Sequence, residues 1–194
     1  AYFRETAGAT DKYGPTTHTQ RMDMAKRIAR ALDRGCLGVS YGIRYVPGID
    51  SEELIATAQP CKKDGKMIAA HVRSDAEEIY DAARELMDTG KALGLPTQIS
   101  HIGSMAGFGQ MRSFLEMVDE ARANGLDVAC DCYPYYAFST TIGSTTYDPG
   151  WLERYHCDYD AIELCEGKYK GTRCTKETFE EMRRDMPECM TVCY

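Results

Sequence analysis

The feature of this sequence that most constrains its fold is a repeated alternation of short apolar segments with longer segments of helical period. Four apolar segments of strand length recur along the chain: CLGVSYG, MIAAHV, PTQISH and LDVACDCYPY. Because these segments consist almost entirely of apolar or small residues, both faces of each strand are expected to be covered, as in a parallel sheet. The alternation therefore predicts an α/β fold with parallel strands and right-handed crossovers.

The segments between the strands carry signals for the ends of helices. A helix in residues 50–66 has Asp50 or Ser51 as its N-cap, and Pro60 is expected to break it. The helix-like segment 109–125 has an apolar face that is expected to point inward. Four residues make up this face: Phe114, Leu115, Val118 and Ala121.

The regular alternation ends near residue 147 and divides the chain into three expected parts. Residues 1–146 are expected to hold the central four to five βα units of a partial barrel. Residues 147–174 are aromatic, acidic and punctuated by glycine, which indicates an inserted, lid-like segment. Residues 175–194 read as a return to a barrel helix and strand. Because no helix follows that last strand, we expect the chain to be part of a longer fold.

Composition and charge exclude several classes of protein. Hydrophobic residues make up 43% and charged residues 27% of the chain, which is typical of a globular domain. The net charge of −7 disfavours nucleic-acid binding, and we expect no membrane span because no apolar run is long enough. The N-terminus lacks a signal-peptide pattern. The nine cysteines fall mostly within helix and strand patterns and lack zinc-finger spacing, so we expect reduced thiols in the cytoplasm.

Two histidines stand at corresponding points of neighbouring apolar segments. His71 ends IAAH, His101 ends TQISH, and the two are 30 residues apart. Strand alternation puts His71 on one face of its strand with Ala69, and His101 on one face of its strand with Ile99. If the strands are parallel, both imidazoles emerge at the carboxyl edge of the sheet, where (β/α) enzymes assemble their sites. Imidazole is a common zinc ligand, so a metal site is one hypothesis and hydrogen-bonded structural histidines are the other.

Two further segments place candidate binding groups at the same edge. In DCYPYYAFST, Tyr133 and Ser139 offer hydroxyl donors for a carboxylate or carbonyl oxygen. In GVSYGIRYVPG, Tyr45 follows a strand and a Gly-rich turn, as in the wall of a substrate pocket. In both segments simple packing of the aromatic rings is the alternative.

The other basic candidates have simpler interpretations. Arg73 could bind a substrate carboxylate, but pairing with an acidic side chain in residues 75–77 is favoured. His18 and His156 lie outside the strand ends and are expected at the surface.

Four segments in this order and spacing resemble the D-aminoacylase (N-acyl-D-amino-acid deacylase) branch of the amidohydrolase superfamily: GCLGVSYGIRYVPG, AAHVRSDAEE, GLPTQISHIGSMAG and GLDVACDCYPYYAFST. The resemblance spans about residues 20–145. It implies a (β/α)8 TIM-type barrel that hydrolyses the amide bond of N-acyl-D-amino acids with zinc or another divalent metal. The chain looks like the middle of that barrel, about its strands three to seven.

The resemblance also implies roles for five residues. His71 and His101 match the two histidines that hold the tightly bound zinc ion, and Tyr45, Tyr133 and Ser139 match positions that line the substrate pocket. The family's H-x-H motif, its bridging thiolate and its catalytic aspartate have no match here. We therefore expect no catalytic base within this chain and expect that base downstream of residue 194.

Two alternatives to deacylation of N-acyl-D-amino acids stay open. The family often has a lysine two residues after its second histidine, where this sequence has Gly103. An amidohydrolase that acts on a cyclic amide or imide is therefore one alternative. The other is a non-catalytic half-barrel that forms a homo-oligomer and so covers its unpaired strand edges.

Overall fold

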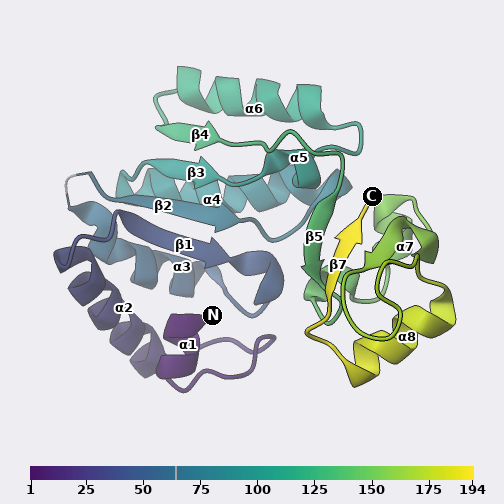
Figure 1. Cartoon of the computed structure of the whole chain (residues 1–194). Coiled ribbons are helices and arrows are strands. Elements are labelled where there is room, and N and C mark those ends of the chain that lie inside the picture. The colour runs from purple at the N-terminus through teal and green to yellow at the C-terminus, as the bar shows by residue number, and fades with distance from the viewer. Residues whose placement is uncertain (64) are drawn as a thin grey trace. The chain divides into compact units, whose positions relative to one another are not determined.

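Four parallel strands form a sheet in the N-terminal part of the chain, in the order β1-β2-β3-β4. The computed structural model describes residues 1–63 and 65–194. The strands are β1 (Gly38–Gly42), β2 (Met67–His71), β3 (Thr97–Ile99) and β4 (Val128–Cys130), and their arrows point the same way in Figure 1. Each of the four apolar segments thus forms one strand, and the predicted parallel sheet is confirmed.

Helices precede β1 and connect the four strands, as the sequence predicts. They are α1 (Tyr2–Thr6), α2 (His18–Asp33), α3 (Ser51–Ala58), α4 (Ile79–Leu93), α5 (Ile102–Met105) and α6 (Met111–Ala123), with short 3-10 turns η1 (Ile43–Tyr45), η2 (Gln59–Lys62) and η3 (Ala76–Glu78). The Asp50 side chain caps α3 by accepting a hydrogen bond from the Glu53 N–H at 2.8 Å. The α-helical part of α3 ends at Ala58, so the predicted break near Pro60 is confirmed.

One face of the sheet is buried beneath helices. In β2, Ile68 and Ala70 are fully buried, and the alternate residues Met67, Ala69 and His71 are only partly buried. Helix α4 packs on β3 and α6 packs on β4. Phe114 of α6 is fully buried, but Leu115 is 38% exposed, so the prediction that Leu115 points inward is wrong. Adjacent helix residues point about 100° apart, and the buried face of α6 is too narrow to take both.

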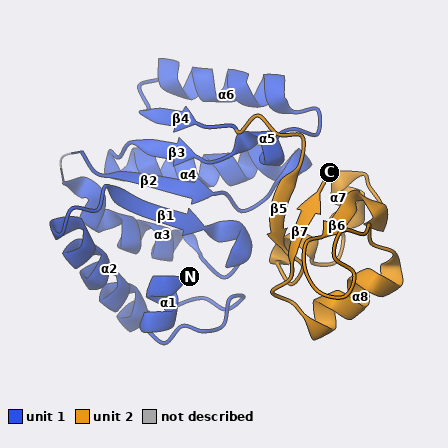
Figure 2. Ribbon diagram, in the orientation of Figure 1, with its two compact units in different colours: residues 1–132 blue, residues 133–194 orange. Residues whose placement is uncertain are grey.

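Residues 133–194 form a separate compact unit (Figure 2). Its three strands are antiparallel, in the order β5 (Phe138–Thr141), β7 (Met190–Cys193) and β6 (Ile162–Leu164). Its helices are α7 (Trp151–Tyr155) and α8 (Lys176–Asp185), with 3-10 turns η4 (Thr145–Tyr147) and η5 (Tyr159–Ala161). The ring centroids of Trp151 and Phe179 are 5.4 Å apart in a stacked arrangement, which builds an aromatic core for this unit.

The two units divide after Cys132, which differs from the expected boundaries at 146/147 and 174/175. The strand expected to return to the barrel, β7, pairs here with β5 and β6 in the antiparallel sheet. The assignment of 147–174 as an inserted segment stays a prediction. No helix in residues 1–63 and 65–194 has the length and apolar character needed to cross a membrane.

Candidate metal site at the carboxyl edge of the parallel sheet

His71 and His101 lie side by side at the carboxyl edge of the parallel sheet. Their ring centroids are 4.5 Å apart, with an angle of 73° between the ring planes. His71 is the last residue of β2, and His101 follows the neighbouring strand β3 after Ser100. The predicted position of both imidazoles at this edge is confirmed, whereas their role as metal ligands stays a prediction.

The two histidines do not meet for the reason that strand alternation suggests. In the register of β2 and β3, Ala70 lies opposite Ile99, and both side chains are fully buried on the helix-covered face. Continued alternation would put His101 on that same face, away from His71. Instead β3 ends at Ile99, and His101 adopts the left-handed backbone conformation, with φ 42° and ψ 51°. This turn takes His101 out of the strand alternation and allows its ring to contact His71.

The side chain of Asp131, which was not predicted as a site residue, binds the backbone of His101. The Asp131 carboxylate, directly after β4, accepts a hydrogen bond from the His101 N–H at 2.6 Å. Its other oxygen accepts one from the Gln98 side-chain amide at 2.7 Å. The available signal was the position of Asp131, directly after an apolar strand at the edge where the histidines lie.

The Ser104 hydroxyl contacts the ring of His101. Its oxygen lies 3.0 Å from the His101 carbonyl oxygen and 3.2 Å from His101 Nδ1. In the tautomer in which Nδ1–H donates to this oxygen, Nε2 keeps a lone pair. This arrangement is typical of histidine ligands of metals.

His71 is held neutral by its surroundings. It is partly buried, and the ring of Tyr45, from η1, lies 4.7 Å from it in an edge-to-face arrangement. Burial, with smaller contributions from the nearby His101 and Arg44, lowers the pKa of His71 to about 3. A neutral imidazole at pH 7 keeps a lone pair for a cation. The contact with His71 also places Tyr45, one of the predicted substrate-binding residues, beside the histidine pair.

The donor set at this edge fits a metal ion in part. Two adjacent imidazoles supply nitrogen ligands, and a zinc site takes about four ligands in total. Among residues 1–63 and 65–194, no group of three or more His, Cys, Asp or Glu side chains could hold a metal ion. The pair therefore fits as half of a metal site whose other ligands come from elsewhere.

The two other predicted substrate-binding residues, Tyr133 and Ser139, belong to the unit 133–194. The Tyr133 ring centroid lies 6.0 Å from that of Tyr135. The Ser139 hydroxyl, in β5, donates a hydrogen bond to the Thr191 carbonyl oxygen at 2.8 Å. Their assignment to a substrate pocket stays a prediction.

Arg73 ties the loop that carries Tyr45 to helix α4. Its guanidinium donates two hydrogen bonds to the Glu85 carboxylate, at 2.7 and 2.9 Å, and another to the Pro47 carbonyl oxygen at 2.8 Å. The favoured pairing of Arg73 with an acidic side chain in residues 75–77 is therefore wrong, because α4 brings the Glu85 carboxylate, 12 residues along the chain, to the guanidinium. The expectation that His18 and His156 are exposed is confirmed.

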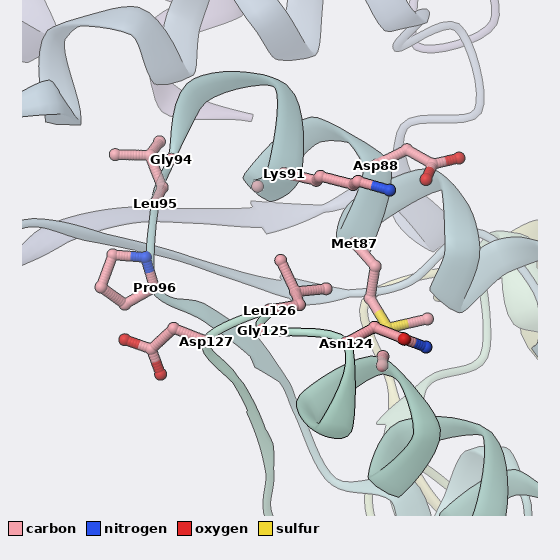
Figure 3. A pocket seen from close by; sticks show the side chains of 12 residues that line it. Met87, Asp88, Lys91, Gly94, Leu95, Pro96, Asn124, Gly125, Leu126 and Asp127 are labelled. Atoms are coloured by element: carbon pink, nitrogen blue, oxygen red, sulfur yellow. The ribbon is translucent and has the colours of Figure 1, made fainter.

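A separate hollow of about 580 Å³ opens at the opposite, amino-terminal edge of the sheet (Figure 3). Its walls are the C-terminal parts of α4 and α6 and the turns directly before β3 and β4. Met87 and Leu126 are part of the apolar lining, and Lys91, Asp88 and Asp127 are the charged lining. Its lining residues include no histidine. The histidine pair and this hollow are thus at opposite ends of the strands.

Comparison with known proteins gives the same family as the sequence motifs. The chain is 34% identical over 132 residues to N-acyl-D-glutamate deacylase of Alcaligenes xylosoxydans xylosoxydans, covering 66% of this chain and 27% of that protein. D-aminoacylase of the same organism is 34% identical over 116 residues, covering 58% of this chain and 24% of that protein. This chain is a homologue of part of the D-aminoacylases. No family model matches it.

The fold comparison agrees with this relationship. A crystal structure of N-acyl-D-glutamate deacylase from Bordetella bronchiseptica, complexed with zinc and a phosphonate mimic of the tetrahedral intermediate, matches with a TM-score of 0.77 at 25% identity. The match covers 95% of this chain and 40% of that one. The chain thus spans about a quarter of the length of its curated relatives and about two fifths of this solved D-aminoacylase homologue. The predicted partial barrel of this family is confirmed.

Proposed function

We propose that this chain is the central part of a zinc-dependent amidohydrolase that hydrolyses the amide bond of N-acyl-D-amino acids. The observation that carries the proposal is the pair of adjacent imidazoles, His71 and His101, at the carboxyl edge of a parallel sheet. The D-aminoacylase relatives support the reaction class, and the zinc in the related N-acyl-D-glutamate deacylase structure supports the choice of metal.

Each residue has a proposed task in the whole enzyme. His71 and His101 hold the metal through neutral imidazole nitrogens. When bound, zinc would supply an activated water and polarise the acyl carbonyl group. Tyr45, Tyr133 and Ser139 are each proposed to contact the substrate, and the tyrosine hydroxyl groups would donate to its acyl or carboxylate oxygens. The catalytic base comes from outside these 194 residues.

The substrate we favour is a small N-acyl-D-amino acid, because the relatives include N-acyl-D-glutamate and N-acyl-D-aspartate deacylases. Hydrolysis of a cyclic amide or imide is the alternative for the same scaffold, since Gly103 lacks the positive side chain that often follows the family's second histidine. Parallel testing of both substrate classes with the whole enzyme separates the two.

Self-association is a second candidate role for the isolated chain. β1 and β4 stand at the two ends of the four-stranded sheet, so each has one edge without a partner strand among the described residues. A homo-oligomer would cover these edges. A monomer by light scattering would contradict this role. We also propose a reducing, cytoplasmic location, supported by nine free and mostly buried or half-buried thiols.

The zinc content of the purified chain tests the metal proposal. We expect about one zinc ion per chain by plasma mass spectrometry, lost in the His71→Ala/His101→Ala double variant. The matched control is His18→Ala/His156→Ala, which removes two exposed imidazoles and is expected to keep the metal. Equal zinc in both double variants would assign the metal to other groups, such as the thiols, and would refute the proposed ligands.

A further inference from the structure

His101 reaches His71 only because its backbone leaves the strand pattern, and this departure needs support. A left-handed backbone conformation is unfavourable for residues other than glycine, and single residues keep it only where neighbouring groups hold them. His101 has φ 42° and lies two residues beyond Ile99, the last residue of β3. What holds His101 in this conformation therefore decides whether the two imidazoles share a site.

Asp131 contacts this turn from the adjacent strand through its main chain and its side chain. The Asp131 N–H donates to the Ile99 carbonyl oxygen at 3.2 Å, and its own carbonyl oxygen accepts from the Ile102 N–H at 2.8 Å. These two bonds place the aspartate directly beside His101. Its carboxylate then accepts from the His101 N–H at 2.6 Å and from the Gln98 amide at 2.7 Å.

Any residue except proline at position 131 could make the two main-chain hydrogen bonds, but the two hydrogen bonds of the carboxylate require the aspartate side chain. A hydrogen bond to an ionised acceptor is shorter and stronger than one between neutral groups. One oxygen binds the His101 N–H, and the bond to Gln98 fixes the other oxygen, so the carboxylate cannot rotate away without losing both. The main-chain bonds would survive truncation of the side chain, but the His101 N–H would lose its acceptor.

We propose that Asp131 is a positioning residue of the metal site, which holds the backbone of His101 in the left-handed conformation and so aims its imidazole at His71. The inference rests on the proposed metal-binding function and adds a residue that contacts a ligand histidine rather than the metal. Residues that orient metal ligands in this way typically change metal affinity about 10- to 100-fold when removed.

The test uses the ¹⁵N-labelled 194-residue chain and the variants Asp131→Ala and Asp127→Ala. Asp127 and Asp131 flank β4 at its two ends, and both are exposed, so the control removes the same charge from the same strand. In the metal-free chain, the amide proton of His101 is expected far downfield in the wild type and in the Asp127 variant. It is expected to move upfield in the Asp131 variant, where the carboxylate acceptor is gone.

Zinc titration then gives the second readout, followed on the ring signals of His71 and His101 so that zinc bound by thiols does not interfere. We expect the Kd for zinc to rise about tenfold in Asp131→Ala and to stay unchanged in Asp127→Ala. If the ring signals of the wild-type chain do not change when zinc is added, the proposed function is refuted. The amide signal of His101 would still test the role of Asp131.

The inference about Asp131 is overturned if both its variant and the control keep the wild-type His101 amide shift and zinc affinity. If Asp131→Ala fails to fold, Asp131→Asn replaces it, with Asp127→Asn as control. The asparagine keeps an acceptor of the same shape and loses the charge, so a smaller change in the same direction is expected. No difference between the two asparagine variants would equally overturn the inference.

Discussion

The low pKa of His71 predicts that the metal-free chain loses stability as the pH falls below neutral. The folded-state pKa is about 3, below the value of about 6.5 for an unfolded histidine, so the unfolded chain binds more protons between these two values. Stability linked to His71 is therefore complete above about pH 6.5 and falls as the pH decreases towards 3. With these values, the free energy of unfolding drops by about 2 kcal/mol between pH 7 and pH 5.

Urea denaturation at pH 7 and pH 5, in the presence of a chelator, measures this loss. Carboxylates and other histidines also titrate, so the quantity of interest is the difference in pH dependence between the wild type and His71→Gln. The variant is expected to lose about 2 kcal/mol less than the wild type over this range. His18→Gln, which removes an exposed imidazole, is the matched control for loss of a histidine. An identical pH dependence in wild type and His71→Gln would refute the argument that burial keeps this imidazole neutral.

Two further predictions concern the contacts that helix α4 makes with strand β3 and with Arg73. A Cβ on Gly90 would lie 2.0 Å from the Thr97 hydroxyl oxygen, so Gly90→Ala is expected to destabilise the chain by about 1–3 kcal/mol in urea denaturation, despite the better helix propensity of alanine. Adding Thr97→Ala should recover part of this loss, and a Gly90→Ala variant more stable than the wild type would contradict the packing argument. Arg73→Lys loses the bidentate pair with the Glu85 carboxylate and is expected to lower the free energy of unfolding by about 1–3 kcal/mol. An unchanged urea midpoint would show that the guanidinium is not needed to hold the loop against α4.

The strands and most of the helices could be predicted from the sequence because their signals are local. Apolar runs of strand length, the Asp50 cap and the break near Pro60 each act within a few residues, and the structure places elements accordingly. The exposure of Leu115 could not be predicted in the same way. Helical period shows which way a residue points, but the width of the buried face depends on how α6 rests on β4.

The long-range pairing of strands and side chains could not be predicted from the sequence for a similar reason. The segment 190–193 reads as a strand on its own, but nothing within it specifies antiparallel partners at 138–141 and 162–164. Likewise the acidic residues nearest to Arg73 in the sequence were the natural candidates for its partner. The partner of Arg73 in the structure is Glu85, because helix α4 places its carboxylate beside the guanidinium.

The sequence by itself determined that two histidines follow neighbouring parallel strands, and from the surrounding motifs it determined the family. Tertiary structure alone decided that the two rings meet. Period-2 alternation assigns His101 to the helix-covered face, and only the left-handed turn beside Asp131 brings it to His71. The physical reason is that side-chain alternation is a local property of a strand, whereas the conformation of a residue just past the strand is selected by contacts from the next strand in the sheet.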